Sequence, residues 1–168
     1  MTWRPDFAAN LADGYRLDGS FEAHDDRSSV SAAGSMDTTI SDQARLWAGI
    51  MRGEGLSAAA RSEFSRPHFP LTSASQFPTF TTKTDARTSQ IQLAAGFGVV
   101  TFRDANGLNF FKGGHNDSTG NMVICQESRK RCVVLLANSV RAELVYPEMV
   151  RLILGDTSMP WCSESGQE

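Results

Sequence analysis

The chain has 168 residues, with 16 Lys and Arg against 19 Asp and Glu and a formal net charge of -3 at neutral pH. This length is sufficient for one domain with a sizeable core. The one dense basic run, Ser128 to Arg131, has no aromatic neighbours, so neither a nucleic-acid-binding surface nor a nucleic-acid partner is predicted. No apolar stretch is long enough for a membrane span, and the first residues lack the pattern of an export signal.

The N-terminal third of the chain divides into an irregular part and a helical part. Residues 1–35 are rich in Asp, Ala, Gly and Ser without sustained periodicity, and we predict an irregular surface segment. Residues 39–66 are predicted to be helical. Thr39 or Ser41 is placed to cap the first helix, and Gly53 with Gly55 ends it. An apolar face at helical spacing is supplied by Ala44, Leu46, Trp47, Ile50 and Met51.

A second short helix is predicted to begin after Ser57 and to end before Pro67. Residues 67–88 follow, with three prolines and many hydroxyl side chains. This composition is typical of an extended loop, and we predict one over the whole segment.

Residues 90–138 are predicted to form antiparallel strands. Asn106-Gly107 is a strong hairpin signal, and the connections are too short for crossover helices. The expected strand segments are "QIQLAAGFGVVTF", "LNFFKGG", "NMVICQ" and "RCVVLLAN". We therefore expect an antiparallel meander.

The last predicted element is a helix over residues 143–155, despite Pro147, with Gly155 at its end. Helices before and after an antiparallel sheet make the expected fold class α+β, in one domain spanning residues 1–168.

Cys125 and Cys132 flank a predicted tight turn and would lie opposite each other across the hairpin. Two alternatives remain open: a disulfide, which a non-hydrogen-bonded pair of neighbours permits, or two small buried thiols. The chain has no C-x-x-C motif and its histidines do not cluster. Neither a metal site nor a cofactor is predicted.

Several catalytic motifs are absent from the sequence. No S-x-x-K and no G-x-S-x-G occurs, and "GGHND" lacks the Lys-Ser/Thr and the helix of a phosphate loop. A serine–histidine–aspartate triad assembled from His24, His68 or His115 has little support, because serines and aspartates are abundant.

The segment "LNFFKGGHND" offers two interpretations. Lys112 is either a strand-end lysine whose stem packs on Phe110 or Phe111 while its ammonium reaches water, or a charge beside a ligand site. In the second case Gly113 and Gly114 expose the strand backbone, whose N–H groups would bond a ligand. His115 on its own is typical of a polar turn residue, as are the asparagine and aspartate after it.

The order of segments resembles the C-terminal part of the serine β-lactamase-like superfamily, in particular the class C β-lactamase, D-alanyl-D-alanine carboxypeptidase and esterase group. The segments that carry this resemblance are "NLADGY", "SAAGSMDTTISDQARLWAGIMRGEGLS", "GFGVVTF", "LNFFKGGHNDSTGNMVI" and "KRCVVLLAN". They follow the family's order, and the resemblance as a whole extends over essentially all 168 residues. The implied fold is an incomplete β-lactamase/transpeptidase-like fold.

The resemblance implies roles for four residues. Lys112-Gly113-Gly114 would take the place of the family's Lys-Thr/Ser-Gly or His-x-Gly motif. Lys112 would hold the active-site hydrogen-bond network and attract an anionic substrate group, and Gly113 and Gly114 would lie against the substrate. The backbone N–H of His115 would be an oxyanion-hole donor.

The sequence also departs from the family. Gly113 replaces a hydroxyl residue that contacts the substrate carboxylate, which weakens the case for β-lactams and D-Ala-D-Ala and leaves esters or amides more open. The S-x-x-K and Tyr-x-Asn motifs are missing: Tyr15 and Tyr146 are not followed by asparagine two residues on.

We therefore expect a fragment of a hydrolase that acts on small esters, amides or peptides through an acyl-serine in the full-length parent, and that is inactive alone. The alternative is a non-enzymatic module that binds a ligand or partner through an open sheet edge, where strands of the parent would be missing. Relatives are usually periplasmic or secreted, but the sequence predicts no location.

Overall fold

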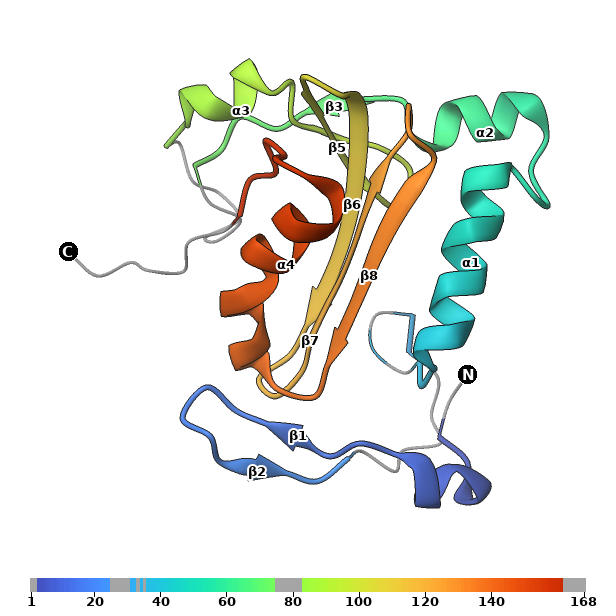
Figure 1. Ribbon diagram of the computed structural model, residues 1–168, viewed down its shortest axis with the longest axis vertical. Helices are drawn as coiled ribbons and strands as arrows, with labels where there is room; N and C mark the ends of the chain where they lie inside the picture. The colour runs from blue at the N-terminus through green and yellow to red at the C-terminus, as the bar shows by residue number, and fades with distance from the viewer. Residues whose placement is uncertain (1–2, 25–30, 33, 35, 75–82, 162–168) are drawn as a thin grey trace.

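The computed structural model describes residues 3–24, 31–32, 34, 36–74 and 83–161. These residues form a six-stranded antiparallel sheet, a separate two-stranded sheet and flanking helices (Figure 1). The predicted α+β class with an antiparallel meander is confirmed.

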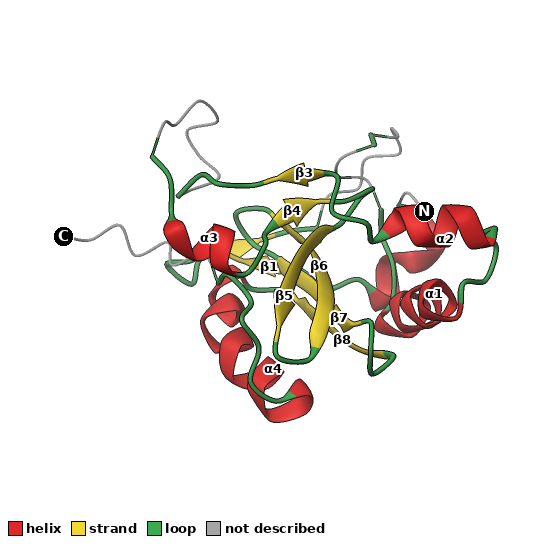
Figure 2. Ribbon diagram, turned by 90° about the horizontal axis from the view of Figure 1, so that it is seen from above, coloured by secondary structure: helices red, strands yellow, loops and turns green. Residues whose placement is uncertain are grey.

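The large sheet follows chain order, and each strand pairs with the next one. Figure 2 shows this order from β3 to β8 in a view from above. Its outermost strands, within the described part of the chain, are β3 and β8. The strands are β3 (Phe69–Pro70), β4 (Ala94–Ala95), β5 (Val100–Asp104), β6 (Gly107–His115), β7 (Gly120–Gln126) and β8 (Arg131–Ala137).

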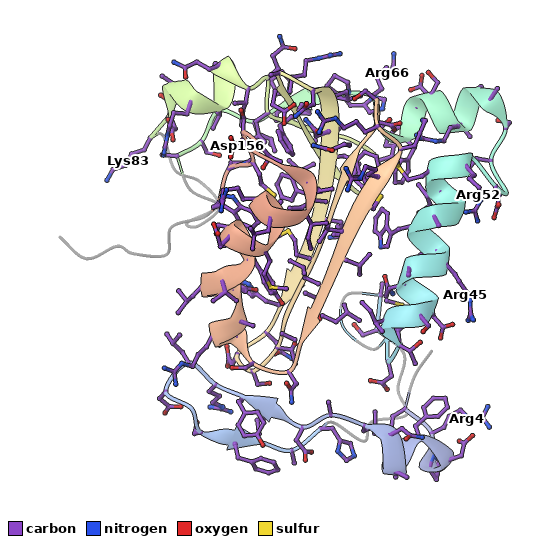
Figure 3. All side chains as sticks on the ribbon, viewed as in Figure 1. Arg4, Arg45, Arg52, Arg66, Lys83 and Asp156 are labelled. Atoms are coloured by element: carbon purple, nitrogen blue, oxygen red, sulfur yellow. A yellow bond between two sulfur atoms is a disulfide. The ribbon has the colours of Figure 1, made fainter. Side chains whose placement is uncertain are left out.

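Helices α1 (Ile40–Arg52) and α4 (Tyr146–Leu154) lie on opposite sides of β8 (Figure 1). Successive side chains of a strand point to opposite faces of the sheet, so the sheet has two cores. The core under α1 contains Trp47, Met51, Val99, Phe110, Val123 and Cys125. The core under α4 contains Phe102, Ile124, Val133, Leu135, Tyr146, Val150, Leu154 and Met159. Arg45, labelled in Figure 3, lies on the side of α1 turned away from β8.

The ends of the first two helices agree with the predicted caps. Thr39 accepts a hydrogen bond from the backbone N–H of Asp42 at 3.1 Å, and Gly53 ends α1 at a φ of 76°. A positive φ favours glycine because it has no Cβ. Ser57 accepts from the N–H of Ala60 at the start of α2 (Ala58–Phe64).

The segment predicted as a loop over 67–88 is not irregular throughout. It contains β3, and helix α3 (Ala86–Gln90) begins within it. Asp85 caps α3 by accepting the N–H of Arg87 at 2.8 Å, a short local signal that the prediction overlooked. As a result the strand expected from residue 90 is wrong at its start, and β4 begins at Ala94. The part of the predicted loop at 75–82 lies outside the described residues.

The helix predicted over 143–155 is shorter. A 3-10 helix, η2 (Val140–Val145), precedes α4. Pro147 falls in the first turn of α4, where a missing N–H is tolerated because helix-starting N–H groups have no partner within the helix. The proline therefore marks the beginning of α4.

The predicted irregular segment at 1–35 also contains regular structure. It forms a 3-10 helix, η1 (Pro5–Asn10), and a small hairpin of β1 (Gly14–Tyr15) and β2 (Phe21–Glu22). The N–H of Tyr15 donates to the carbonyl oxygens of Asn138 at 2.9 Å and Ser118 at 3.2 Å. These bonds hold β1 next to the end of β8, a contact across the chain that local composition does not reveal.

Cys125 and Cys132 form a disulfide, which decides between the two alternatives that the sequence left open. They are directly opposite each other in the register of β7 and β8. Cys125 is fully buried in the core under α1. The disulfide therefore closes the β7–β8 hairpin from inside the core.

Candidate functional site

The candidate site lies at the C-terminal end of β6. The sequence predicted a strand over "LNFFKGG", which ends at Gly114, and β6 continues one residue further to His115. Residues 112–115 pair with β7, from Lys112 opposite Val123 to His115 opposite Gly120. Pairing with β5 ends one residue earlier, where Phe111 lies opposite Val100. Within the described part of the chain, the last four residues of β6 are thus paired on one side only.

The direction of the backbone groups follows from two hydrogen bonds. The carbonyl of Leu108 accepts from the N–H of Glu127 at 3.1 Å, and the N–H of Asn116 donates to Thr119 at 3.2 Å. Both bonds are on the β7 side, so even-numbered residues here direct their backbone groups to β7. Because the direction alternates along an antiparallel strand, Gly113 and His115 direct their N–H and C=O groups to the unpaired side.

The two glycines keep the strand accessible. A Cβ built on Gly114 would meet no described atom within 4 Å, and one built on Gly113 would meet only Met122 and the Asn121 carbonyl, at 3.7 and 3.8 Å. A ligand strand is therefore able to approach this backbone closely.

The side chains of Lys112 and His115 are not brought together. Lys112 shares the α1 face of the sheet with Phe110 and is exposed. His115 lies on the α4 face, where its Nδ1 is 3.3 Å from Oε1 of Glu143. The structure therefore places the side chains of Lys112 and His115 on opposite faces of the sheet, while the backbone N–H of His115 is directed to the unpaired side of β6.

The β7 backbone opposite His115 is held in place by residues of η2 and α4. The hydroxyl of Tyr146 donates to the carbonyl of Gly120 at 2.7 Å, and a Cβ at Gly120 would lie 2.8 Å from Glu143. Burial, together with the nearby charge of Glu143, raises the pKa of Tyr146. Tyr146 therefore stays a hydrogen-bond donor and fixes the β7 backbone opposite His115.

Glu143 is a candidate site residue that sequence reasoning missed. It lies in η2 and approaches His115 and Gly120 only through the fold. No spacing in the sequence connects these positions.

The turn after β6 is fixed by Asn116. Its Oδ1 accepts from the backbone N–H groups of Ser118 and Thr119 at 2.9 and 2.7 Å, and from both of their hydroxyls. This is the turn-forming role that the sequence indicated for Asn116.

A self-contained triad receives no support from the described contacts. Ser118 is buried, and its hydroxyl donates to Asn116. The histidines have other partners: His24 contacts Asp13, His68 contacts Glu63 and stacks on Phe97, and His115 contacts Glu143. None of these contacts joins a histidine to a serine.

In the described part of the chain, no three side chains of His, Cys, Asp or Glu gather in a way that would hold a metal ion. Among the same residues, no helix is both long and apolar enough to cross a bilayer.

No family model, no curated protein and no solved structure matches this chain. The β-lactamase-like resemblance therefore rests on the order of the sequence segments alone.

Proposed function

We propose that residues 112–115 at the end of β6 form one side of the substrate site of a β-lactamase-like serine hydrolase, which we call the β6 wall. The chain does not catalyse the reaction alone. The observation that carries the proposal is the one-sided end of β6. There the N–H groups of Gly113 and His115 face an unpaired edge, next to the bare backbone of Gly114 and the exposed cation of Lys112.

The proposed chemistry is acyl transfer from an ester or amide. In the parent enzyme, a serine from another part of the polypeptide attacks the carbonyl carbon and the alcohol or amine leaves. Water then releases the acyl group. The N–H of His115 donates to the carbonyl oxygen as it gains negative charge, and a rigid donor aimed at that position stabilises the transition state.

Lys112 has the role of attracting an anionic group of the substrate. No described residue forms an ion pair with it. Its charge is therefore available to a ligand along the edge of β6, on the α1 face. Gly114 leaves the room that such a ligand needs.

A binding experiment tests the wall without requiring catalysis. The probe is N-acetyl-D-alanine, an anion, compared with its neutral methyl ester, and the readout is the amide ¹H–¹⁵N spectrum of the full chain. We expect both probes to shift the amide signals of Gly113 and His115, while the amide of Gly107 at the other end of β6 stays in place. Unchanged signals at 113 and 115 would contradict the proposal.

Variants assign the roles within the wall. Lys112→Ala should weaken binding of the anion about fivefold, as expected for one exposed charge, and leave the ester unaffected. Lys130→Ala removes the same charge at the distant β7–β8 turn and is the matched control. Gly114→Val should abolish binding of both probes with the fold intact, because its side chain enters open space.

Two further observations address the parent reaction. The purified chain should not turn over a chromogenic cephalosporin or a p-nitrophenyl ester. Turnover by the chain alone would contradict the proposal, and turnover that survives Lys112→Ala would also exclude a role for Lys112. In the DNA immediately upstream of the Met1 codon, an in-frame S-x-x-K followed by Tyr-x-Asn would support the assignment to the family.

A further inference from the structure

The outer edge of β8 is open. No described strand pairs with it, and its even-numbered residues direct their N–H and C=O groups outward, because the alternation set at β6 and β7 sends the odd-numbered groups to β7. Cys132, Val134 and Leu136 are these even-numbered residues, and no described residue bonds their backbone groups. Just beyond β8, the carbonyl of Asn138 already accepts the N–H of Tyr15.

This edge also lacks the usual protection. Natural edge strands are commonly blunted by charges, prolines or bulges. From Cys132 to Ala137, β8 reads "CVVLLA" and carries no charge and no proline. Its pairing with β7 is continuous, without a bulge.

A groove of about 730 Å³ runs along the edge on the α1 side. It is lined by Ile40, Ala44, Trp47, Ala48, Met51, Arg52, Lys130, Cys132 and Val134. A strand added beside β8 would place every second side chain into this groove, opposite Cys132 and Val134.

On the other side of the edge, α4 presents exposed apolar side chains. Tyr146, Val150 and Leu154 face the sheet, whereas Met149 and Ile153, four residues apart on one flank, are 39% and 46% exposed. Arg131 of β8 donates to the carbonyl of Ile153 at 3.1 Å, so this flank borders β8. The alternate side chains of an added strand would meet it.

One end of the groove is basic. Arg52 and Lys130 line it there. The carboxylates nearby are Glu54, which contacts Arg52, and Glu127, which contacts Lys130 and Arg61. Three basic groups, Arg52, Lys130 and Arg61, thus stand against two carboxylates, and the end of the groove retains positive charge.

We infer that the β8 edge is a docking site for an extended, apolar strand of another polypeptide that carries an acidic residue at the end next to Arg52 and Lys130. The backbone of that strand pairs with Cys132, Val134 and Leu136. One set of its side chains enters the α1 groove and the other set covers Met149 and Ile153. Adding a strand to an open edge is an established way of recognising an extended peptide.

A second copy of the chain fits this surface less well. Residues 132–137 bring no acidic group to the basic end. Pairing two β8 strands antiparallel would also bring the two α4 helices together on one face. Figure 2 shows α4 reaching further out than β8 on the open side, so these helices would meet before the strands do.

The test uses a fluorescein-labelled, end-capped peptide as long as β8, Thr-Val-Thr-Val-Thr-Val-Asp, and the full chain. Matched peptides carry Lys in place of Asp, Asp at the first position instead of the last, or N-methyl groups on every amide. Fluorescence anisotropy gives affinity, and Trp47, which lines the groove, gives an independent emission signal. Sedimentation velocity reports the oligomeric state.

We expect the Asp peptide whose carboxylate lies at the basic end to bind about tenfold more tightly than the Lys peptide, and the N-methylated peptide not to bind. The position of Asp that gives the tighter binding shows the direction of the added strand: the last position indicates an antiparallel strand, and the first a parallel one.

Val134→Pro removes an outward N–H while the odd-numbered bonds to β7 remain, and should weaken binding of the peptide at least about tenfold. Ala44→Phe, on an exposed position of α1, fills the groove and should do the same without disturbing the sheet.

The inference would be overturned if the N-methylated peptide bound as tightly as the unmodified Asp peptide. It would also be overturned if Val134→Pro and Ala44→Phe both bound the Asp peptide with the affinity of the native chain. A stable dimer that the peptide does not dissociate would overturn it as well, because the edge would then belong to a second copy. These readouts involve no turnover and no residue of the β6 wall, so their failure is separable from failure of the proposed function.

Discussion

The carboxylate of Glu127 lies 2.7 Å from Nη2 of Arg61, a residue 66 positions away in the sequence. Both side chains are largely buried, at 15% and 17% exposure. Glu127 also accepts from Ser65 at 2.9 Å and from Lys130 at 3.1 Å. The network fastens α2 to the turn between β7 and β8, and through that turn to the disulfide hairpin.

Glu127→Gln should lower the free energy of unfolding by about 2 kcal/mol, because Arg61 would lose its partner in a largely buried position. Urea denaturation followed by circular dichroism measures the effect. Glu148→Gln is the matched control, since the Glu148–Arg151 pair is exposed and should contribute nothing measurable. Equal effects of the two substitutions would contradict this account of the network.

The carboxylate of Glu127 should also make the free energy of unfolding depend on pH in the acid range. Burial alone would raise the pKa of Glu127, but hydrogen bonds from Arg61, Lys130 and Ser65 outweigh it and hold the pKa below its ordinary value of 4.5. A lowered pKa in the folded state means that the unfolded state binds the proton more readily. The stabilisation is therefore full above pH 4.5 and is lost as the pH falls through the folded-state pKa. The difference in free energy of unfolding between the native chain and Glu127→Gln should therefore narrow as the pH falls below 4.5. If this difference did not change with pH, the ionised carboxylate of Glu127 would not be the source of the stabilisation.

The fold class follows from local patterns, because alternating apolar residues and an Asn-Gly turn specify hairpins over short distances. Thr39, Gly53 and Ser57 likewise act on backbone groups within a few residues of themselves. The hairpin of β1 and β2 could not be predicted in this way, since its place depends on Tyr15 bonding to Asn138. Two-residue strands such as β3 carry no periodicity at all.

For the candidate site, the sequence indicated the glycines and the lysine. Their geometry depends on where β5 stops pairing, a property of two strands together. The contact between His115 and Glu143 joins β6 to η2, and no local pattern encodes it. Sequence patterns therefore singled out Lys112, Gly113 and Gly114, and tertiary structure determined which backbone groups at the end of β6 face outward.

The disulfide should contribute to stability. Closing the short β7–β8 loop restricts the unfolded chain, and the expected contribution is about 2 kcal/mol. Cys125→Ala with Cys132→Ala should lower the urea midpoint accordingly, and a reducing agent should destabilise the native chain but not the double variant. Non-reducing mass spectrometry after alkylation provides the check: three alkylated cysteines in the untreated protein would show that the bond is absent.

Phe110 joins α1 and α2 to the sheet. It is fully buried, with its ring centroid 6.2 Å from that of Trp47 and 5.6 Å from that of Phe64. Phe110→Ala should destabilise the protein by about 3–5 kcal/mol through lost burial and a cavity. Phe97→Ala is the control, because Phe97 is 60% exposed and stacks only on His68 among the described aromatic contacts. A loss below about 1 kcal/mol for Phe110→Ala would show that the α1 core is packed differently.

Gly120 and Glu143 lie close together behind the candidate site. A Cβ on Gly120 would lie 2.8 Å from both Cγ and Oε1 of Glu143, too close for van der Waals contact. Gly120→Ala should therefore cost about 1–3 kcal/mol of stability, as overpacked positions do. Gly114→Ala adds the same methyl group to open space on the neighbouring strand and should change stability little.

Glu143→Ala removes the obstructing atoms, so combining it with Gly120→Ala should recover most of the stability that Gly120→Ala loses. Strict additivity in this double-mutant cycle would place the strain elsewhere. Recovery would show that Glu143 requires a glycine opposite His115, where η2 supports the end of β6.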